Sequence, residues 1–212
     1  MKIVIVSGGN PPSYSLITEE LEDCSFLICA DSGGNCLYKY NIIPDYLMGD
    51  FDSISEEAMN FFLKQSKCSI ENYPSDKDFT DTELVFNKAL ELGGKKIIFL
   101  GCTGTRIDHL MGNIGMLAKC LRQNIKGYIK DNNNCIEITN KPVKITGNYG
   151  ATFSLQAYSN VVKNLTIKGA KYELLNYDLS LGDARTVSNQ FLYEEVEITF
   201  DEGVILILYS KD

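Results

Sequence analysis

Two patterns of hydrophobic residues alternate along the first 130 residues or so. Continuous apolar runs, such as Ile3–Val6 and Phe26–Ala30, are followed by segments whose apolar residues recur every three or four positions. Continuous runs are typical of strands buried on both faces, and the longer spacing is typical of amphipathic helices. The alternation predicts an α/β domain with a mostly parallel sheet that helices cover on both sides.

Capping residues predict where several of these helices begin and end. The clearest helix is expected over residues 80–94, where Thr80 and Glu83 form a plausible capping box and Gly93-Gly94 end the periodic pattern. Ser55 is a similar cap for a helix that follows it. The stretch "PDYLMGDFDS", residues 44–53, is predicted to be extended.

The pattern changes after about Asn132. Short segments rich in β-branched residues, such as "VKITG" and "GVILILYS", are separated by Gly, Asn and Asp, and no convincing helical spacing occurs. This is typical of a small all-β sandwich or barrel. We therefore expect two domains, an α/β domain over residues 1–130 and an all-β, sandwich-like domain over residues 131–212.

Composition and charge narrow the functional classes. The 212 residues are 44% hydrophobic and carry a net charge of −8, which argues against a nucleic-acid scaffold because such a surface must neutralise phosphates. No apolar run approaches the ~20 residues that span a bilayer, and the short apolar N-terminus does not resemble a signal peptide. A cytoplasmic protein without membrane or nucleic-acid partners is expected. With a single histidine and no C-x-x-C spacing among seven cysteines, a zinc site is not expected.

Polar clusters follow several of the predicted strands, and in open α/β sheets ligands bind at these carboxyl ends. In "MGDFDSI", Asp50 and Asp52 flank Phe51. In an extended segment both carboxylates would point to the same side, with Phe51 anchored inward. Shared metal ligation and a solvated loop are both compatible with this spacing taken alone.

Three further clusters surround this one in the predicted sheet. The first, "CADSGGN", places Asp31 at the end of a strand and before a Gly turn. The second, "YPSDKDFTDTE", has three acids at the start of a predicted helix: Asp76, Asp78 and Asp81. The third, "LGCTGTRIDH", is a Gly/Thr loop with Arg106. Each has a structural alternative, namely an N-cap, a helix-dipole acid or a connecting turn.

The clusters together indicate one kind of chemistry. Mg²⁺-assisted phosphoryl transfer uses three kinds of group: carboxylates that hold a divalent cation, a loop whose amides and hydroxyls bind phosphate, and an arginine. The clusters contain all three. Neither a Walker A loop nor a G-x-G-x-x-G after the first strand is present. A single histidine leaves no basis for a Ser/His/Asp or Cys/His triad.

The order and approximate spacing of these motifs resemble the thiamin pyrophosphokinase family. The matching stretches are "ADSGGNCL", "PDYLMGDFDSI", "DKDFTDTELV", "GCTGTRIDHLMGNI" and, in the β region, "LLNYDLSLGDARTVSNQF". The resemblance implies a homodimeric enzyme, with its active site near the subunit interface, that uses Mg²⁺ to transfer pyrophosphate from ATP to the hydroxyl of thiamin. The products would be thiamin diphosphate and AMP.

The resemblance also implies residue roles. Asp50, Asp52 and Asp81 match the metal-binding and catalytic acids. The remaining matches are to the nucleotide, phosphate and thiamin sites: Asp31, Asn35, Asp78, Thr103, Arg106, Asp108, His109, Ser188 and Asn189. Asp81 or Asp78 would accept the proton of the thiamin hydroxyl.

The chain departs from the family pattern at two places. Ser32 and Gly34 replace a Gly and an Ala of the usual A-D-G-G-A-N motif, and no tryptophan is present to stack on thiamin. Phe191 or Tyr193 are the expected substitutes. Two other functions use the same acids: a Mg²⁺-dependent phosphohydrolase or nucleotidyltransferase, and a non-catalytic thiamin or nucleotide sensor.

Overall fold

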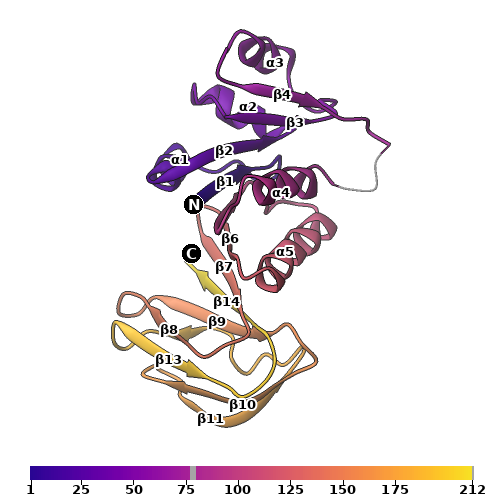
Figure 1. Ribbon diagram of the computed structural model, residues 1–212. Coiled ribbons are helices and arrows are strands. Elements are labelled where there is room, and N and C mark those ends of the chain that lie inside the picture. Colours follow the sequence, from indigo (N-terminus) through magenta and orange to yellow (C-terminus); the bar gives the residue numbers. More distant parts are fainter. Residues whose placement is uncertain (77–79, 212) are drawn as a thin grey trace. The chain divides into compact units, whose positions relative to one another are not determined.

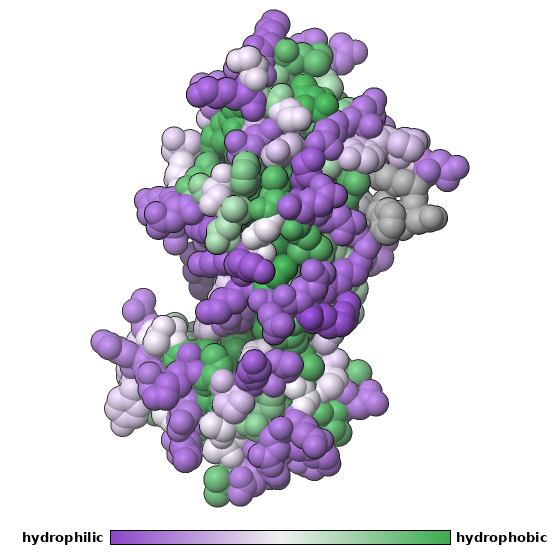
Figure 2. Space-filling model, viewed as in Figure 1, coloured by the Kyte–Doolittle hydropathy of each residue, from purple (hydrophilic) through white to green (hydrophobic). Residues whose placement is uncertain are grey.

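The computed structural model describes residues 1–76 and 80–211, and it contains two compact units (Figure 1). The N-terminal unit is Met1–Asn132 and the C-terminal unit is Asn133–Asp212. Each unit has its own hydrophobic core, and the two are described separately below. Within the described residues, no helix is both long and apolar enough to cross a membrane. On the face drawn in Figure 2, hydrophilic side chains predominate, in keeping with the net charge of −8.

The N-terminal unit contains a parallel sheet in the order β6-β5-β1-β2-β3-β4. Its strands are β1 Lys2–Val6, β2 Cys24–Ala30, β3 Tyr46–Gly49, β4 Ser69–Asn72, β5 Lys96–Leu100 and β6 Lys126–Lys130. From β1 the chain builds outward through β2, β3 and β4, and it then returns to the other side of β1 with β5 and β6. The strand order therefore reverses at β1, where open parallel sheets bind ligands. The predicted parallel sheet is confirmed.

Helices cover both faces of this sheet, as its sequence predicts. They are α1 Tyr14–Leu21, α2 Gly33–Lys39, α3 Glu56–Leu63, α4 Asp81–Glu91 and α5 Ile107–Arg122. Val4 and Val6 pack with residues of α1, α2 and α3, and Ile3 and Ile5, which alternate with them in the sequence, are also fully buried. Because side chains alternate along a strand, burial of both sets means that both faces of β1 are covered.

The predicted helix caps are confirmed. The Ser55 hydroxyl accepts a hydrogen bond from the Ala58 amide, and the Thr80 hydroxyl accepts one from the Glu83 amide. Gly93 follows α4 with a φ of +81°, a left-handed conformation that glycine adopts without strain. Asp81 thus occupies the first turn of α4, where the helix dipole favours a negative charge.

The expected extended conformation of "GDFDS" is wrong in detail. Strand β3 ends at Gly49, and Phe51 has a φ of +61°, which is uncommon for a residue with a side chain. The expected inward direction of Phe51 is confirmed, because its ring packs against the buried cluster that includes Phe62. A left-handed turn around an anchored ring, rather than strand alternation, therefore orients the two aspartates.

The C-terminal unit consists of two antiparallel sheets. One has the order β12-β9-β14-β7 and the other β11-β10-β13-β8. The strands are β7 Asn134–Thr139, β8 Val143–Thr146, β9 Thr152–Ala157, β10 Val161–Lys168, β11 Leu174–Ser180, β12 Asn189–Gln190, β13 Glu195–Thr199 and β14 Ile205–Ser210. The predicted all-β class of this region is confirmed.

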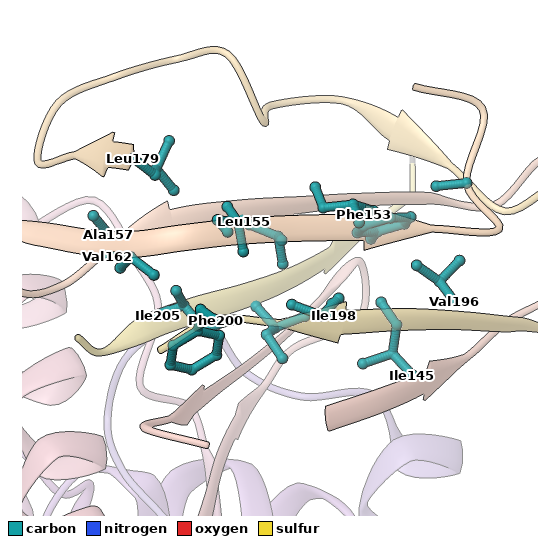
Figure 3. Packing of buried hydrophobic residues seen from close by; sticks show 14 of the residues in the cluster. Ile145, Phe153, Leu155, Ala157, Val162, Leu179, Val196, Ile198, Phe200 and Ile205 are labelled. Atoms are coloured by element: carbon teal, nitrogen blue, oxygen red, sulfur yellow. The ribbon is translucent and has the colours of Figure 1, made fainter. Parts of the chain in front are cut away.

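Side chains of both sheets meet in one core, which makes the unit a sandwich (Figure 3). Phe153 and Leu155 of β9 and Ile205 of β14 come from the first sheet, and Val162 of β10 and Val196 of β13 come from the second. All five are fully buried. The loop from 181 to 188 and the short strand β12 follow β11.

Candidate active site

A cavity of about 630 Å³ lies at the carboxyl ends of the central strands of the N-terminal unit. Residues that directly follow β1, β2, β3 and β5 line it, together with the first turn of α4 and the start of α5. The cavity thus spans the point where the strand order reverses. The sequence-predicted residues that line it are Asp31, Asp50, Asp52, Asp81, Thr103, Arg106 and His109.

Three aspartates approach each other closely in this cavity. Asp31, Asp50 and Asp52 each place one carboxylate oxygen within 4.8 Å of the others. Asp31 is 7% exposed, and its Oδ1 atom is buried without a hydrogen-bond partner among the described residues. An unpaired buried carboxylate oxygen is costly unless a ligand completes the site.

The electrostatics of Asp31 reflect this crowding. Burial raises the pKa of the Asp31 carboxyl above its ordinary value, and the negative charges of Asp81, Asp50 and Asp52 raise it further. Asp31 also has a φ of +39°, so its backbone is strained as well. Both features indicate a group held in place by its surroundings rather than one that stabilises the fold.

Short hydrogen bonds shape the acidic loop beside Asp31. The Ser53 hydroxyl donates to Asp52 Oδ1 at 2.6 Å, and the Asp52 amide donates to Asp50 Oδ1 at 3.4 Å. Asn35 does not belong to the cavity lining, but its side chain holds this loop: it donates to the Ser53 carbonyl at 3.1 Å and accepts from the Ser55 amide at 2.8 Å.

The loop between β5 and α5 forms the opposite part of the lining. Thr103 Oγ1 is buried and has no hydrogen-bond partner among the described residues. Asn113 of α5 holds the loop by donating to the Cys102 carbonyl at 2.8 Å. The loop therefore presents a hydroxyl that a phosphate oxygen would satisfy.

The basic side chains among the described lining residues are Arg106 and His109. Arg106 forms a double hydrogen bond with Asp108, through Nε to Oδ1 at 3.3 Å and through Nη2 to Oδ2 at 2.6 Å. This pairing with Arg106 lowers the pKa of Asp108 to about 2. Asp108 is exposed and does not line the cavity itself, but it contacts Arg106, which does.

The remaining predicted residues lie elsewhere. Asp78 falls outside the residues that the structure describes. Ser188 and Asn189 belong to the C-terminal unit, where Ser188 is exposed with a φ of +59° and Asn189 is buried. The carboxamide of Asn189 accepts from the Tyr172 amide at 3.0 Å and donates to the Tyr172 carbonyl at 2.8 Å.

One expectation for the aromatic substitutes is wrong. Phe191 is 1% exposed and packs on Phe153 in the sandwich core, with ring centroids 4.8 Å apart, so it does not offer a face to a ligand. Tyr193, at 70% exposed, remains available.

Sequence reasoning missed the segment Ser7–Asn10, which also lines the cavity. The segment lacks a G-x-G-x-x-G pattern, and Pro11 and Pro12 directly after it do not suit a helix start of the dinucleotide-binding type. Its signal was the pair Gly8-Gly9 directly after a fully buried strand, because glycine there permits close backbone approach. A Cβ on Gly9 would meet the Thr103 carbonyl oxygen at 2.2 Å.

Comparison with protein families matches both units. The family model described as "Thiamin pyrophosphokinase, catalytic domain" covers residues 17–129, more than half of the 212 residues. The chain belongs to the thiamin pyrophosphokinase family. A second model, described as "Thiamin pyrophosphokinase, vitamin B1 binding domain", covers residues 134–205. The resemblance expected from the motifs is confirmed, and the chain is a member of an enzyme family.

Individual relatives agree with this membership. The chain is 31% identical to "Thiamine pyrophosphokinase" of Bacillus subtilis (strain 168) over 217 residues, covering 99% of each chain. A crystal structure of thiamine pyrophosphokinase from Bacillus subtilis superimposes with a TM-score of 0.91 at 31% identity over 100% of both chains. One from Geobacillus thermodenitrificans gives 0.86 at 28% identity, covering 100% of this chain and 98% of that one.

Proposed function

We propose that the protein catalyses Mg²⁺-dependent transfer of pyrophosphate from ATP to the hydroxyl of thiamin, giving thiamin diphosphate and AMP. The observation that carries the proposal is the group of Asp31, Asp50 and Asp52, whose carboxylate oxygens lie within 4.8 Å of one another. Thr103, whose buried hydroxyl has no partner among the described residues, lines the same cavity.

The donor set fits a hard divalent cation. Asp31, Asp50 and Asp52 offer only carboxylate oxygens, which are the ligands that Mg²⁺ prefers, and the orphaned Asp31 oxygen gains a partner when a cation is bound. Asp81, which lines the same cavity, supplies a further carboxylate. A bound Mg²⁺ would neutralise phosphate charge and polarise the phosphoryl group.

The chain's own residues have distinct roles in this proposal. Thr103 and Arg106 bind phosphate oxygens, and Arg106 shares the charge that develops on the departing AMP. Asp81 accepts the proton of the thiamin hydroxyl as the new O–P bond to the β-phosphorus forms and the bond between the α- and β-phosphates breaks. Asp78 remains the alternative base suggested by the sequence.

The C-terminal unit is proposed to bind thiamin, in keeping with the vitamin B1 binding domain that matches it. Ser188 is exposed there, and Asn189 orders the backbone of Tyr172. Thiamin carries a permanent positive charge, so acidic surroundings favour it. We also propose a cytoplasmic homodimer with its active sites near the subunit interface.

Product analysis tests the reaction. The protein is incubated with ATP, Mg²⁺ and thiamin, and thiamin diphosphate and AMP are quantified by chromatography. Phosphate or pyrophosphate released without consumption of thiamin would indicate a hydrolase, and binding without any turnover across several divalent metals would indicate a sensor.

Asp52→Asn is the sharpest variant for this assay. Loss of one carboxylate charge from the cluster is expected to abolish product formation while the melting temperature stays the same or rises, since repulsion is relieved. Asp23→Asn is the matched control: Asp23 is exposed, and its left-handed φ of +57° suits asparagine. A large loss of stability in Asp52→Asn would indicate a structural role instead.

A further inference from the structure

The hydroxyl of Ser7 connects two parts of the cavity lining. Ser7 follows β1 and is 7% exposed. Its Oγ lies 3.0 Å from Oγ1 of Thr82 in the first turn of α4, and its amide donates to the carbonyl of Leu100, the last residue of β5, at 2.9 Å. One residue thus contacts both the helix and the strand that leads into the loop.

Each partner of Ser7 lies close in sequence to a group of the proposed site. Thr82 follows Asp81, the proposed base, and Leu100 precedes the loop that carries Thr103, the proposed phosphate-binding hydroxyl. Because the Ser7 backbone is bonded to β5, the bond from its hydroxyl to Thr82 bears on the separation between Asp81 and Thr103.

The backbone holds the loop side of this arrangement firmly. The Gly9 amide donates to the Gly101 carbonyl at 2.7 Å, and the Asn10 amide donates to the Thr103 carbonyl at 2.6 Å. Gly101 has a φ of +64°, and a Cβ there would meet the Ser7 carbonyl oxygen at 2.1 Å. The loop is therefore fixed against residues 7–10 whatever side chain occupies position 7.

The helix side depends on side chains. Lys88, in the last turn of α4, pairs with Glu71 of β4 at 2.8 Å, and Glu83, in the first turn, pairs with Lys119 of α5. The Glu83–Lys119 pair ties the first turn to α5, whereas the Ser7–Thr82 hydrogen bond ties this turn, where Asp81 lies, to the segment after β1.

We propose that Ser7 is a positioning residue that sets the distance between Asp81 and the Thr103–Arg106 loop through its hydrogen bond to Thr82. The inference rests on the proposed function, because it assigns Asp81 and the loop to opposite sides of the reacting phosphates. Reacting groups displaced by about 1 Å lose up to about 10²-fold in rate. The role of Ser7 should therefore appear in kcat rather than in substrate binding.

A set of four variants tests the proposal: Ser7→Ala, Thr82→Val, the double variant, and Thr82→Ser. Each single hydroxyl deletion is expected to lower kcat about 10-fold with KM for ATP nearly unchanged. The double variant is expected to be no slower than either single one, because both remove the same hydrogen bond. Thr82→Ser keeps the hydroxyl and is expected to retain most of the activity.

The controls separate positioning from a general loss of structure. Thr18→Val deletes a hydroxyl of α1. Among the described residues, this hydroxyl donates to carbonyls in the first turn of the same helix, so the variant is expected to leave kcat and KM unchanged. Melting temperatures of all variants are measured alongside, and each hydroxyl deletion is expected to lower the melting temperature only slightly, since one hydrogen bond is lost.

The outcomes distinguish this inference from the proposed function. Wild-type protein that makes no thiamin diphosphate would overturn both. If the wild type is active, three results would overturn the positioning role alone. These are additive losses of kcat in the double variant, an unchanged kcat in the two single deletions, and a kcat of Thr82→Ser as low as that of Thr82→Val.

Discussion

Two buried polar groups at the cavity of the N-terminal unit differ from the buried polar groups of the C-terminal unit. In the N-terminal unit, Asp31 Oδ1 and Thr103 Oγ1 are buried without partners among the described residues, and both line the cavity. In the C-terminal unit, the buried Thr166, Thr186 and Asn189 all have hydrogen bonds. An unsatisfied buried group costs about 1–3 kcal/mol, so the N-terminal unit carries a cost that the C-terminal unit avoids.

The difference separates groups poised for a ligand from groups that build the fold. The proposed cation would supply Asp31 with the partner that the described residues do not, and burial together with the acids around it raises the pKa of its carboxyl. Asn189 already uses its carboxamide on the Tyr172 backbone, so it contributes order to the thiamin-binding unit. Removing Asp31 should therefore affect activity, whereas removing Asn189 should lower stability.

The largest effect on stability is expected from the sandwich core. Phe191→Ala removes a ring that is 1% exposed and should destabilise the C-terminal unit by about 3–5 kcal/mol, measured by denaturant unfolding. Tyr193→Ala is the matched control, because its ring is 70% exposed. It should leave stability within about 0.5 kcal/mol and raise KM for thiamin if Tyr193 stacks on the substrate. Equal stability losses in both variants would contradict the assignment of Phe191 to the core.

The sequence did not show which side of this segment faces the core. Asn189 and Phe191 are two residues apart and both buried, as alternation requires. Strand β12 has only two residues, too few for a hydrophobic pattern to show which side faces the core. Long, capped elements such as α4 were predictable because many residues indicate the same structure.

The candidate site, too, could be predicted from the sequence only in part. The convergence of Asp31, Asp50 and Asp52 followed from their places at strand ends. The left-handed turn at Phe51 did not follow, because it depends on anchoring of the ring by distant residues. The role of Ser7–Asn10 was hidden for a similar reason: its partners, Gly101 and Thr103, are more than ninety positions away in the sequence.

The next largest effect is expected for Asp31, the carboxylate of the N-terminal unit with an unpaired buried oxygen. Asp31→Asn should lower kcat by at least about 10²-fold, or about 3 kcal/mol, because a cation ligand is lost. Without Mg²⁺ its melting temperature should rise by a few degrees, since an uncompensated buried charge is removed. The rise in melting temperature that Mg²⁺ is expected to cause in wild type should shrink in the variant. A variant that melts below wild type in the absence of metal would show that Asp31 is a structural carboxylate.

A smaller loss is expected for the paired group of the C-terminal unit. Asn189→Ala leaves the Tyr172 amide and carbonyl without their side-chain partner and should cost about 2 kcal/mol of unfolding free energy. Gln190→Ala, next to it, removes only a hydrogen bond to the exposed Lys171 and should cost less than about 0.5 kcal/mol. If Asn189→Ala impaired thiamin binding without loss of stability, direct ligation would replace the ordering role.

The smallest effect comes from a buried carboxylate of the N-terminal unit that is paired. Glu20 is 3% exposed and forms ion pairs with Lys2 and Lys130. Burial raises the pKa of Glu20, but the hydrogen bonds from Lys130 and Lys2 outweigh it, and the net pKa is lowered from 4.5. For Asp31, buried to a similar extent, burial also raises the pKa, and its acidic neighbours add to this rise instead of offsetting it.

A lowered pKa means that Glu20 contributes stability above pH 4.5 and loses it as the pH falls through the folded-state pKa. Glu20→Gln should therefore be less stable than wild type at pH 7, by about 1 kcal/mol for a partly exposed pair of lysines. The two proteins should converge as the pH is lowered below 4, as measured by urea unfolding across this range. A stability difference that stayed constant with pH would mean that packing of the Glu20 side chain, and not its charge, stabilises the unit.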